Sequence, residues 1–171
     1  MNTLFFLIFG FLVYLAYAKI RFGWTRSVSN TYGRLSKIQQ LLPYIVLILC
    51  IVIPFTVLGL HASEGKFFSF LWWVGMAFLI MVGMFPSPKS DSWQEKAHVI
   101  GATGGLGFYT AAAILTLDGI LPKTLGILFI LFTFTQTYKK LGLKIKNNTY
   151  WIEVVWGLLM TGALYFAYYP L

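Results

Sequence analysis

The residues that could carry out acid–base or metal chemistry are few in this chain. Its 171 residues include two histidines, five acidic residues and one cysteine. Glu95 and His98 stand three positions apart, so they share one face if the segment is helical. Glu-x-x-His is also a spacing used by metal sites in helical bundles. Glu153 lies just inside an apolar segment, where ionisable groups are costly and often functional. His98, Glu95 and Glu153 are therefore the candidate catalytic residues.

Each of these candidates also has a purely structural interpretation. Glu95 suits the start of a helix, because acidic groups are favourable near its positive end. Glu153 has tryptophan neighbours, which suits a carboxylate at a membrane interface. His61, the second histidine, is expected at the opposite membrane face from His98, which disfavours a metal site that uses both. We predict neither a bound metal nor a cofactor.

A second group of candidates consists of polar residues that we expect near the same membrane face as His98. The segment RFGWTRSVSNTYGRLSK, residues 21–37, places hydroxyl groups between arginines. Such groups together hold phosphates and carboxylates well, although a solvated loop has the same composition. Polar groups that converge at one membrane face are a reasonable site hypothesis. The candidate ligand-binding residues are Arg26, Ser27, Ser29, Tyr32 and Asp91.

The glycine cluster GATGGLG, residues 101–107, resembles the phosphate-binding turn of a dinucleotide-binding domain. That turn needs a strand before it and further strand–helix units around it, whereas apolar segments flank this cluster on both sides. We therefore exclude a dinucleotide. Small residues let neighbouring helices approach closely inside a membrane. Gly101, Gly104 and Gly105 are predicted to be helix-packing residues.

The elements that must position these residues are apolar segments of the length that crosses a bilayer. Hydrophobic residues make up 58% of the chain and charged residues 11%, whereas soluble domains contain about 25% charged residues. A membrane-spanning helix needs about 20 mostly apolar residues. We predict one transmembrane domain over residues 1–171, an all-α bundle of six helices. Its spans cover about 4–20, 41–60, 67–85, 99–117, 120–138 and 151–169.

The placement of positive charge predicts the orientation of the bundle. The connections after the first, third and fifth spans hold five, two and four of the thirteen basic residues, and only Lys66 and Lys123 lie in the alternate connections. Basic residues favour cytoplasmic loops, so both termini are predicted on the outer, non-cytoplasmic side of a bacterial cytoplasmic membrane. The net charge of +8 then favours anionic lipids as partners. Nucleic acid is not expected, because no soluble basic domain is present.

Two short motifs carry a resemblance to known membrane proteins. SVSNTYGRL and EKAHVIGA resemble the Ser-Ile/Val-Ser-x-x-Tyr and His-x-x-Gly-Ala patterns of a family of small bacterial multi-spanning proteins without an established activity. The match covers Ser27 to Ala102. More remotely, a serine near one span and a histidine near another are similar to CREST-type membrane hydrolases, which include alkaline ceramidases. Those hydrolases hold a metal with three histidines, whereas this chain has two.

The expected function is therefore that of a small polytopic membrane protein without catalytic activity. It would bind a lipid or a protein partner through its polar cytoplasmic face, alone or as a homo-oligomer. One alternative is a CREST-like hydrolase in which His98 acts as base or ligand with Glu95 and Glu153, while Ser27 or Ser29 positions the substrate. A second alternative is a transporter or a subunit of an oligomeric channel.

Overall fold

The computed structural model describes residues 2–23, 44–45, 48–85, 93–138 and 148–170, and every element in these ranges is helical. A π-helical turn over Ile48–Val52 precedes α3, and a short 3₁₀ turn over Phe67–Ser69 precedes α4. The α-helices are α1 (Asn2–Phe22), α3 (Ile53–Ala62), α4 (Phe70–Met84), α5 (Trp93–Thr116), α6 (Ile120–Thr137) and α7 (Asn148–Tyr168).

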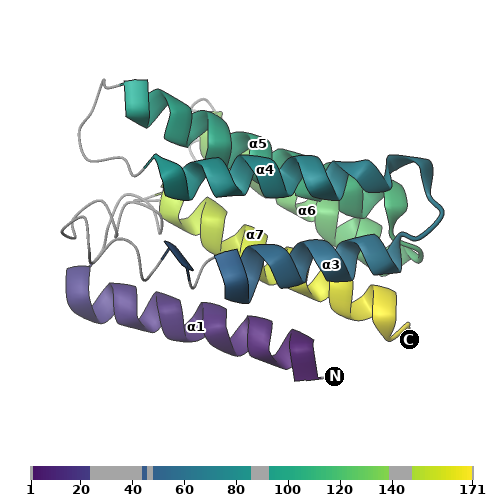
Figure 1. Ribbon diagram of the computed structural model, residues 1–171. Coiled ribbons are helices and arrows are strands. Elements are labelled where there is room, and N and C mark those ends of the chain that lie inside the picture. Colours follow the sequence, from purple (N-terminus) through teal and green to yellow (C-terminus); the bar gives the residue numbers. More distant parts are fainter. Residues whose placement is uncertain (1, 24–43, 46–47, 86–92, 139–147, 171) are drawn as a thin grey trace.

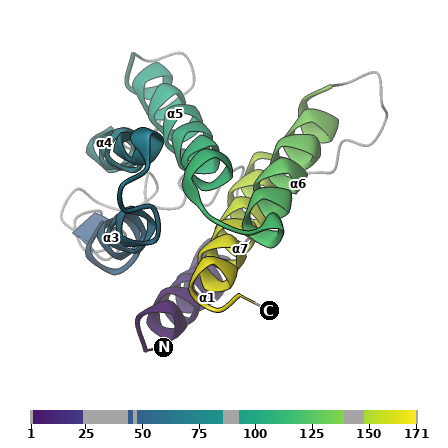
Figure 2. The ribbon, with the colours of Figure 1, turned by 90° about the vertical axis from the view of Figure 1, so that its right-hand side faces the viewer.

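The helices run along one common direction, and both ends of the chain lie at the same end of the bundle (Figure 1). We call this end the turn end, because it also holds the turns at residues 63–66 and 117–119. The opposite end, where α1 finishes with Lys19 and Arg21 and α5 begins with Glu95 and Lys96, is called the basic end. Viewed along the bundle, α5 and α6 meet at the turn end and diverge toward the basic end (Figure 2).

Four described helices are long and apolar enough to cross a membrane: Phe67–Met84, Trp93–Thr116, Ile120–Thr137 and Thr149–Tyr168. They correspond to the last four predicted spans. The helix that contains most of the fourth predicted span, 99–117, is α5, which starts at Trp93. The first residues of α5, WQEKAH, are helical but mostly polar, so they do not belong to the apolar stretch that predicted the span. The predicted span 4–20 lies within α1, and the span 41–60 is only partly described.

Pro54 shapes the helix that contains it. The sequence predicts a kink there, and the structure shows a π-helical turn over Ile48–Val52 followed by α3, with Pro54 in its first turn. Proline has no backbone N–H, and its ring clashes with the carbonyl four residues earlier. A π turn widens the helix at this point, which accommodates Pro54 without a regular hydrogen bond to the residue-50 carbonyl.

The core of the bundle is an aromatic cluster with hydrogen-bonded hydroxyl groups. Phe55, Trp72, Tyr109 and Trp156 come from four different helices, and their ring centroids lie 5.5–6.2 Å apart in the contacting pairs. Hydrogen bonds inside a membrane replace those that water cannot supply. The Trp72 indole donates to Thr116 Oγ1 at 3.2 Å, and the hydroxyls of Thr56 and Tyr109 share a short hydrogen bond.

The glycine cluster lies in the middle of α5 and contacts α4. A Cβ atom built on Gly101 would lie 2.9 Å from the backbone oxygen of Phe78, and one on Gly104 would lie 2.4 Å from the Phe78 ring. A Cβ on Gly105 would approach Leu79 Cδ2 to 2.4 Å. Backbone atoms obstruct a side chain at Gly101, so glycine there permits the observed approach of α4 and α5.

Candidate functional site

Five of the sequence-predicted site residues cannot be placed relative to the bundle. Arg26, Ser27, Ser29, Tyr32 and Asp91 lie outside the described residues. His98, Glu95 and Glu153 are described, as are the three packing glycines. The site is therefore built from the side chains that α5, α6 and α7 carry toward the basic end.

His98 is buried where the start of α5 meets the end of α4. Its Nδ1 lies 2.9 Å from the carbonyl oxygen of Phe85 and 3.2 Å from that of Val82. Carbonyl oxygens only accept hydrogen bonds, so Nδ1 carries a proton. The last carbonyls of a helix lack partners within that helix. His98 therefore caps the C-terminal end of α4.

The candidate catalytic residues do not gather into a metal site. Among the described residues, no three His, Cys, Asp or Glu side chains are close enough together to hold a metal ion. His61 is at the turn end, exposed, with Nδ1 4.0 Å from Glu64 Oε2. His98 is at the far end of α4, so the 15-residue length of that helix separates the two histidines by about 20 Å.

Glu153 of α7 lies near the level of a buried amide on α6. A Cβ on Gly162 of α7 would lie 3.2 Å from Leu125 of α6, which fixes the register of this antiparallel pair. Counting eleven residues toward the basic end from Leu125 on α6 and from Gly162 on α7 leads to Gln136 and Trp151, so these two residues lie at the same level. Glu153 lies within one turn of that level. Gln136 is only 4% exposed. Sequence reasoning missed Gln136, although an amide in an otherwise apolar helix was a readable signal.

Two polar atoms near this level are buried without a hydrogen-bond partner in the described part of the chain: Thr133 Oγ1 on α6 and Trp156 Nε1 on α7. By the same register, Thr133 is level with Val154. An unsatisfied buried donor or acceptor costs about 1–3 kcal/mol. Such atoms call for an explanation, because most buried polar side-chain atoms in proteins are paired.

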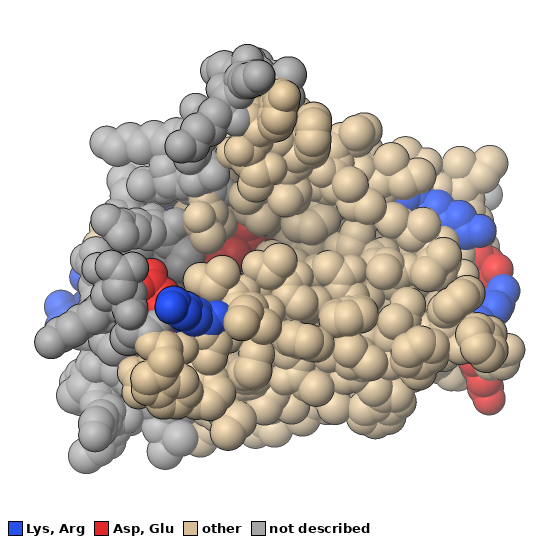
Figure 3. Space-filling view, turned by 90° about the horizontal axis from the view of Figure 1, so that it is seen from above, with Lys and Arg blue, Asp and Glu red and all other residues tan. Residues whose placement is uncertain are grey.

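Seen from the side of Figure 3, acidic atoms lie below the level of the surrounding described side chains. Near the turn end, α5 and α6 touch, since a Cβ on Gly126 of α6 would lie 2.6 Å from Ile114 Cγ1 of α5. Gly107 lies two turns before Ile114 on the same stripe of α5, and a Cβ there would meet nothing within 4 Å. A small side chain at position 107 would therefore meet no other helix.

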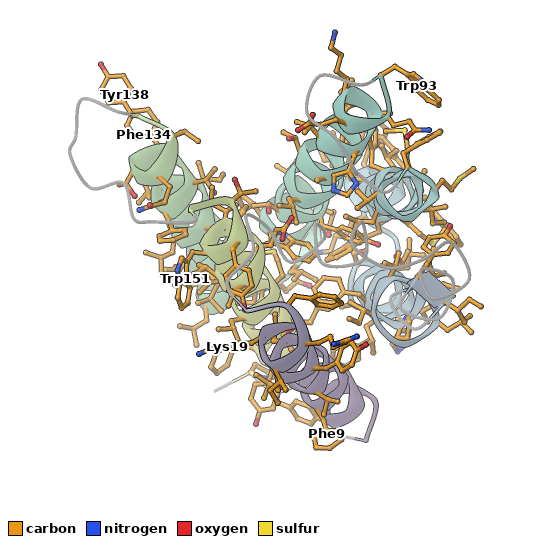
Figure 4. The ribbon with its side chains drawn as sticks, turned by 90° about the vertical axis from the view of Figure 1, so that its left-hand side faces the viewer. Phe9, Lys19, Trp93, Phe134, Tyr138 and Trp151 are labelled. Carbon is orange, nitrogen blue, oxygen red and sulfur yellow. The ribbon has the colours of Figure 1, made fainter. Side chains whose placement is uncertain are left out.

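The two ends of the bundle differ in their surface chemistry. At the basic end, the exposed rings of Trp93 and Tyr138 stand at the tips of α5 and α6, as Figure 4 shows. Exposed aromatic rings at helix ends are typical of membrane interfaces. At the turn end, the Lys66 ammonium donates to the Asp118 carboxylate at 2.7 Å. This hydrogen bond, together with the charges of Lys66 and Lys123, lowers the pKa of Asp118.

No family model matches the chain, and no curated protein or solved structure matches it either. The resemblances carried by SVSNTYGRL and EKAHVIGA therefore stay predictions. The geometry described above is the basis for the functional proposal.

Proposed function

We propose that this chain is a six-span membrane protein that binds anionic lipid headgroups at its basic end, without catalysing a reaction. Both termini then lie on the outer side, and the basic end faces the cytoplasm of a bacterial cell. The four apolar helices long enough to span a bilayer support membrane integration. The 21 residues of α1 and the apolar stretch before Ala62 supply the two further spans.

The observation that carries the binding role is the combination of cations and aromatic rings at one end. Lys19 and Arg21 lie exposed in the last turn of α1, and Lys96 lies exposed at the start of α5. Exposed rings of Trp93 and Tyr138 mark the interface at the same end. Basic residues beside a membrane attract anionic lipids. The Nδ1 proton of His98 caps α4, which gives this histidine a structural role.

The binding role can be tested in nanodiscs that contain phosphatidylglycerol or phosphatidylcholine. Each basic residue near the surface contributes about 1 kcal/mol, so the double variant Lys19→Gln/Arg21→Gln should weaken phosphatidylglycerol binding about 30-fold. The matched control Lys66→Gln/Lys123→Gln removes the same charge at the turn end and should leave that binding unchanged. Equal binding by both double variants would refute the proposal.

The orientation can be tested separately with single cysteines in a Cys50→Ser background. A membrane-impermeant maleimide should label Glu64→Cys in intact cells, because the turn end lies outside. Lys96→Cys should react only after the cells are opened. The reverse pattern would show that the bundle is inserted the other way around.

A further inference from the structure

We propose that the turn end lies at the boundary between the headgroups and the hydrocarbon of the outer leaflet, where Phe67 and Ile120 insert their side chains among lipid acyl chains. The partner of this surface is the bilayer itself, whatever the charge of its headgroups. The inference rests on the proposed insertion in a membrane. It adds a second lipid contact, independent of charge, at the end of the bundle opposite the basic end.

Two nearly fully exposed apolar side chains stand at the turn end. Phe67 is 84% exposed and Ile120 is 82% exposed. They flank the ion pair between Lys66 and Asp118, because Phe67 follows Lys66 directly and α6 begins at Ile120, two residues after Asp118. Large apolar side chains gain free energy when they leave water, and exposed apolar surface rimmed by polar groups marks interaction sites.

The exposed apolar surface of α4 continues past the start of this helix to Phe67. Phe70 and Trp73 are 51% and 54% exposed, and their spacing places them on one face of α4. The Phe68 ring lies 6.5 Å from the Phe70 ring and 5.0 Å from the Phe67 ring, measured between centroids. Lipid that covers the spanning part of α4 therefore meets a continuous row of rings that ends at Phe67.

The backbone of the turn over residues 63–69 is bonded internally. The Ser63 hydroxyl donates to the Gly59 carbonyl, and the Ser69 hydroxyl is shared between the carbonyls of residues 63 and 66. Four backbone N–H groups donate to carbonyls three residues earlier, those of Ser63, Glu64, Lys66 and Ser69. Unpaired backbone groups are costly against hydrocarbon, so this internal bonding allows the turn to lie against lipid.

The ion pair between the two apolar side chains adds no net charge to the surface. The Lys66 ammonium donates to the Asp118 carboxylate at 2.7 Å. A lysine stem can lie along hydrocarbon while its ammonium group stays at the polar level. Basic and acidic atoms lie together at the right-hand, turn end of the bundle in Figure 3. Insertion of Phe67 and Ile120 should therefore not depend on the charge of the lipid.

The experiment measures the depth of nitroxide labels on the full chain in bilayers of phosphatidylcholine. Single cysteines replace Phe67, Ile120 or Glu64 in a Cys50→Ser background, and electron paramagnetic resonance compares collisions with oxygen, which concentrates in hydrocarbon, and with a water-soluble nickel chelate. The Glu64 side chain is 85% exposed, so it is a control of matched exposure in the same turn. We expect an oxygen-to-nickel collision ratio several-fold higher at Phe67→Cys and Ile120→Cys than at Glu64→Cys.

Each other outcome contradicts the proposal in a recognisable way. Equal ratios at the three positions would place Phe67 and Ile120 in water. Protection of both labels from oxygen and from nickel would show that protein, such as a second copy of this chain, covers them. We expect the same ratios in phosphatidylglycerol, and insertion that requires this anionic lipid would overturn the charge-independent contact.

A further label separates failure of this inference from failure of the proposed function. Leu128 is 46% exposed in the middle of α6, so a label at Leu128→Cys reports whether the bundle spans the bilayer. Hydrocarbon contact at Leu128 with water contact at Phe67 would refute only the present inference. Water contact at both positions would refute the proposed membrane insertion. The Lys19→Gln/Arg21→Gln variant should keep Phe67 in hydrocarbon, because its charges lie at the basic end.

Discussion

Replacement of Gly101 by alanine tests the close approach of α4 and α5. A Cβ at this position would lie 2.9 Å from the Phe78 backbone oxygen, 3.1 Å from Val82 Cγ2 and 3.2 Å from the Val82 nitrogen. Carbon–oxygen contacts between helices are normally about 3.3–3.6 Å, so α4 has to move by about 0.4–0.7 Å. The obstructing atoms belong mainly to the α4 backbone, which cannot rotate away as a side chain would.

We expect Gly101→Ala to lower the free energy of unfolding by about 0–2 kcal/mol, because overpacking usually costs about 1–3 kcal/mol and a gain in helix propensity of about 1 kcal/mol offsets part of it. Alanine has a higher helix propensity than glycine, by about 1 kcal/mol, so the measured loss is the steric cost minus this gain. Gly107→Ala is the matched control on the same helix. Its Cβ would meet nothing within 4 Å, so only the propensity gain remains and stability should stay level or rise by up to about 1 kcal/mol.

The assay is reversible unfolding in detergent micelles, followed by tryptophan fluorescence from the aromatic cluster. Both variants are measured under the same conditions, and their free energies of unfolding are compared with that of the unmodified protein. If Gly101→Ala is as stable as Gly107→Ala, the α4–α5 contact is not tight and the structural role of this glycine is wrong. The comparison does not depend on any ligand.

Three further predictions use other contacts of the bundle. In a double-mutant cycle, Thr56→Val and Tyr109→Phe should show a favourable coupling of about 0.6–1.7 kcal/mol in the free energy of unfolding, and additive effects would exclude their hydrogen bond. His98→Ala should destabilise the protein by about 1–3 kcal/mol by leaving α4 carbonyls unpaired. Nitrogen NMR of the imidazole should show a proton on Nδ1 at neutral pH, and a ring protonated on Nε2 instead would contradict the cap. Lys66 lowers the pKa of Asp118 in the folded state. The resulting stabilisation is present above the unfolded pKa of about 3.9 and is lost as the pH falls through the lowered value. Lys66→Gln should therefore flatten the decline of the thermal midpoint below pH 4, and an unchanged decline would count against the ion pair.

The sequence predicted the helical class and most of the described spans, because apolar length alone determines which segments enter a bilayer. The start of α5 at Trp93 does not follow from apolar length, since Trp93–His98 is helical but mostly polar. The π turn was not foreseen: Pro54 indicates a disturbed helix, but a kink and a widened turn are equally compatible with a missing N–H.

The candidate site was less accessible to sequence reasoning. Glu95, His98 and Glu153 were found because ionisable groups stand out against an apolar background. The bonding of His98 to the end of α4 depends on a contact across 13 to 16 residues, and its spacing from Glu95 does not reveal it. Thr133 and Gly107 were missed because an unpaired hydroxyl and an open glycine become visible only when the distance between α5 and α6 is known.

The contacts of α7 also set an order for the assembly of this protein during synthesis. Phe55 and Tyr109 pack on Trp156, and the Tyr168 hydroxyl donates to the Leu58 carbonyl 110 residues earlier in the chain. The α4–α5 hairpin can associate as soon as it leaves the ribosome, because its contacts are local. The aromatic cluster, however, lacks its fourth ring until α7 is made. A nascent chain released before residue 156 would therefore expose Phe55 and Tyr109 to lipid and to quality-control proteases.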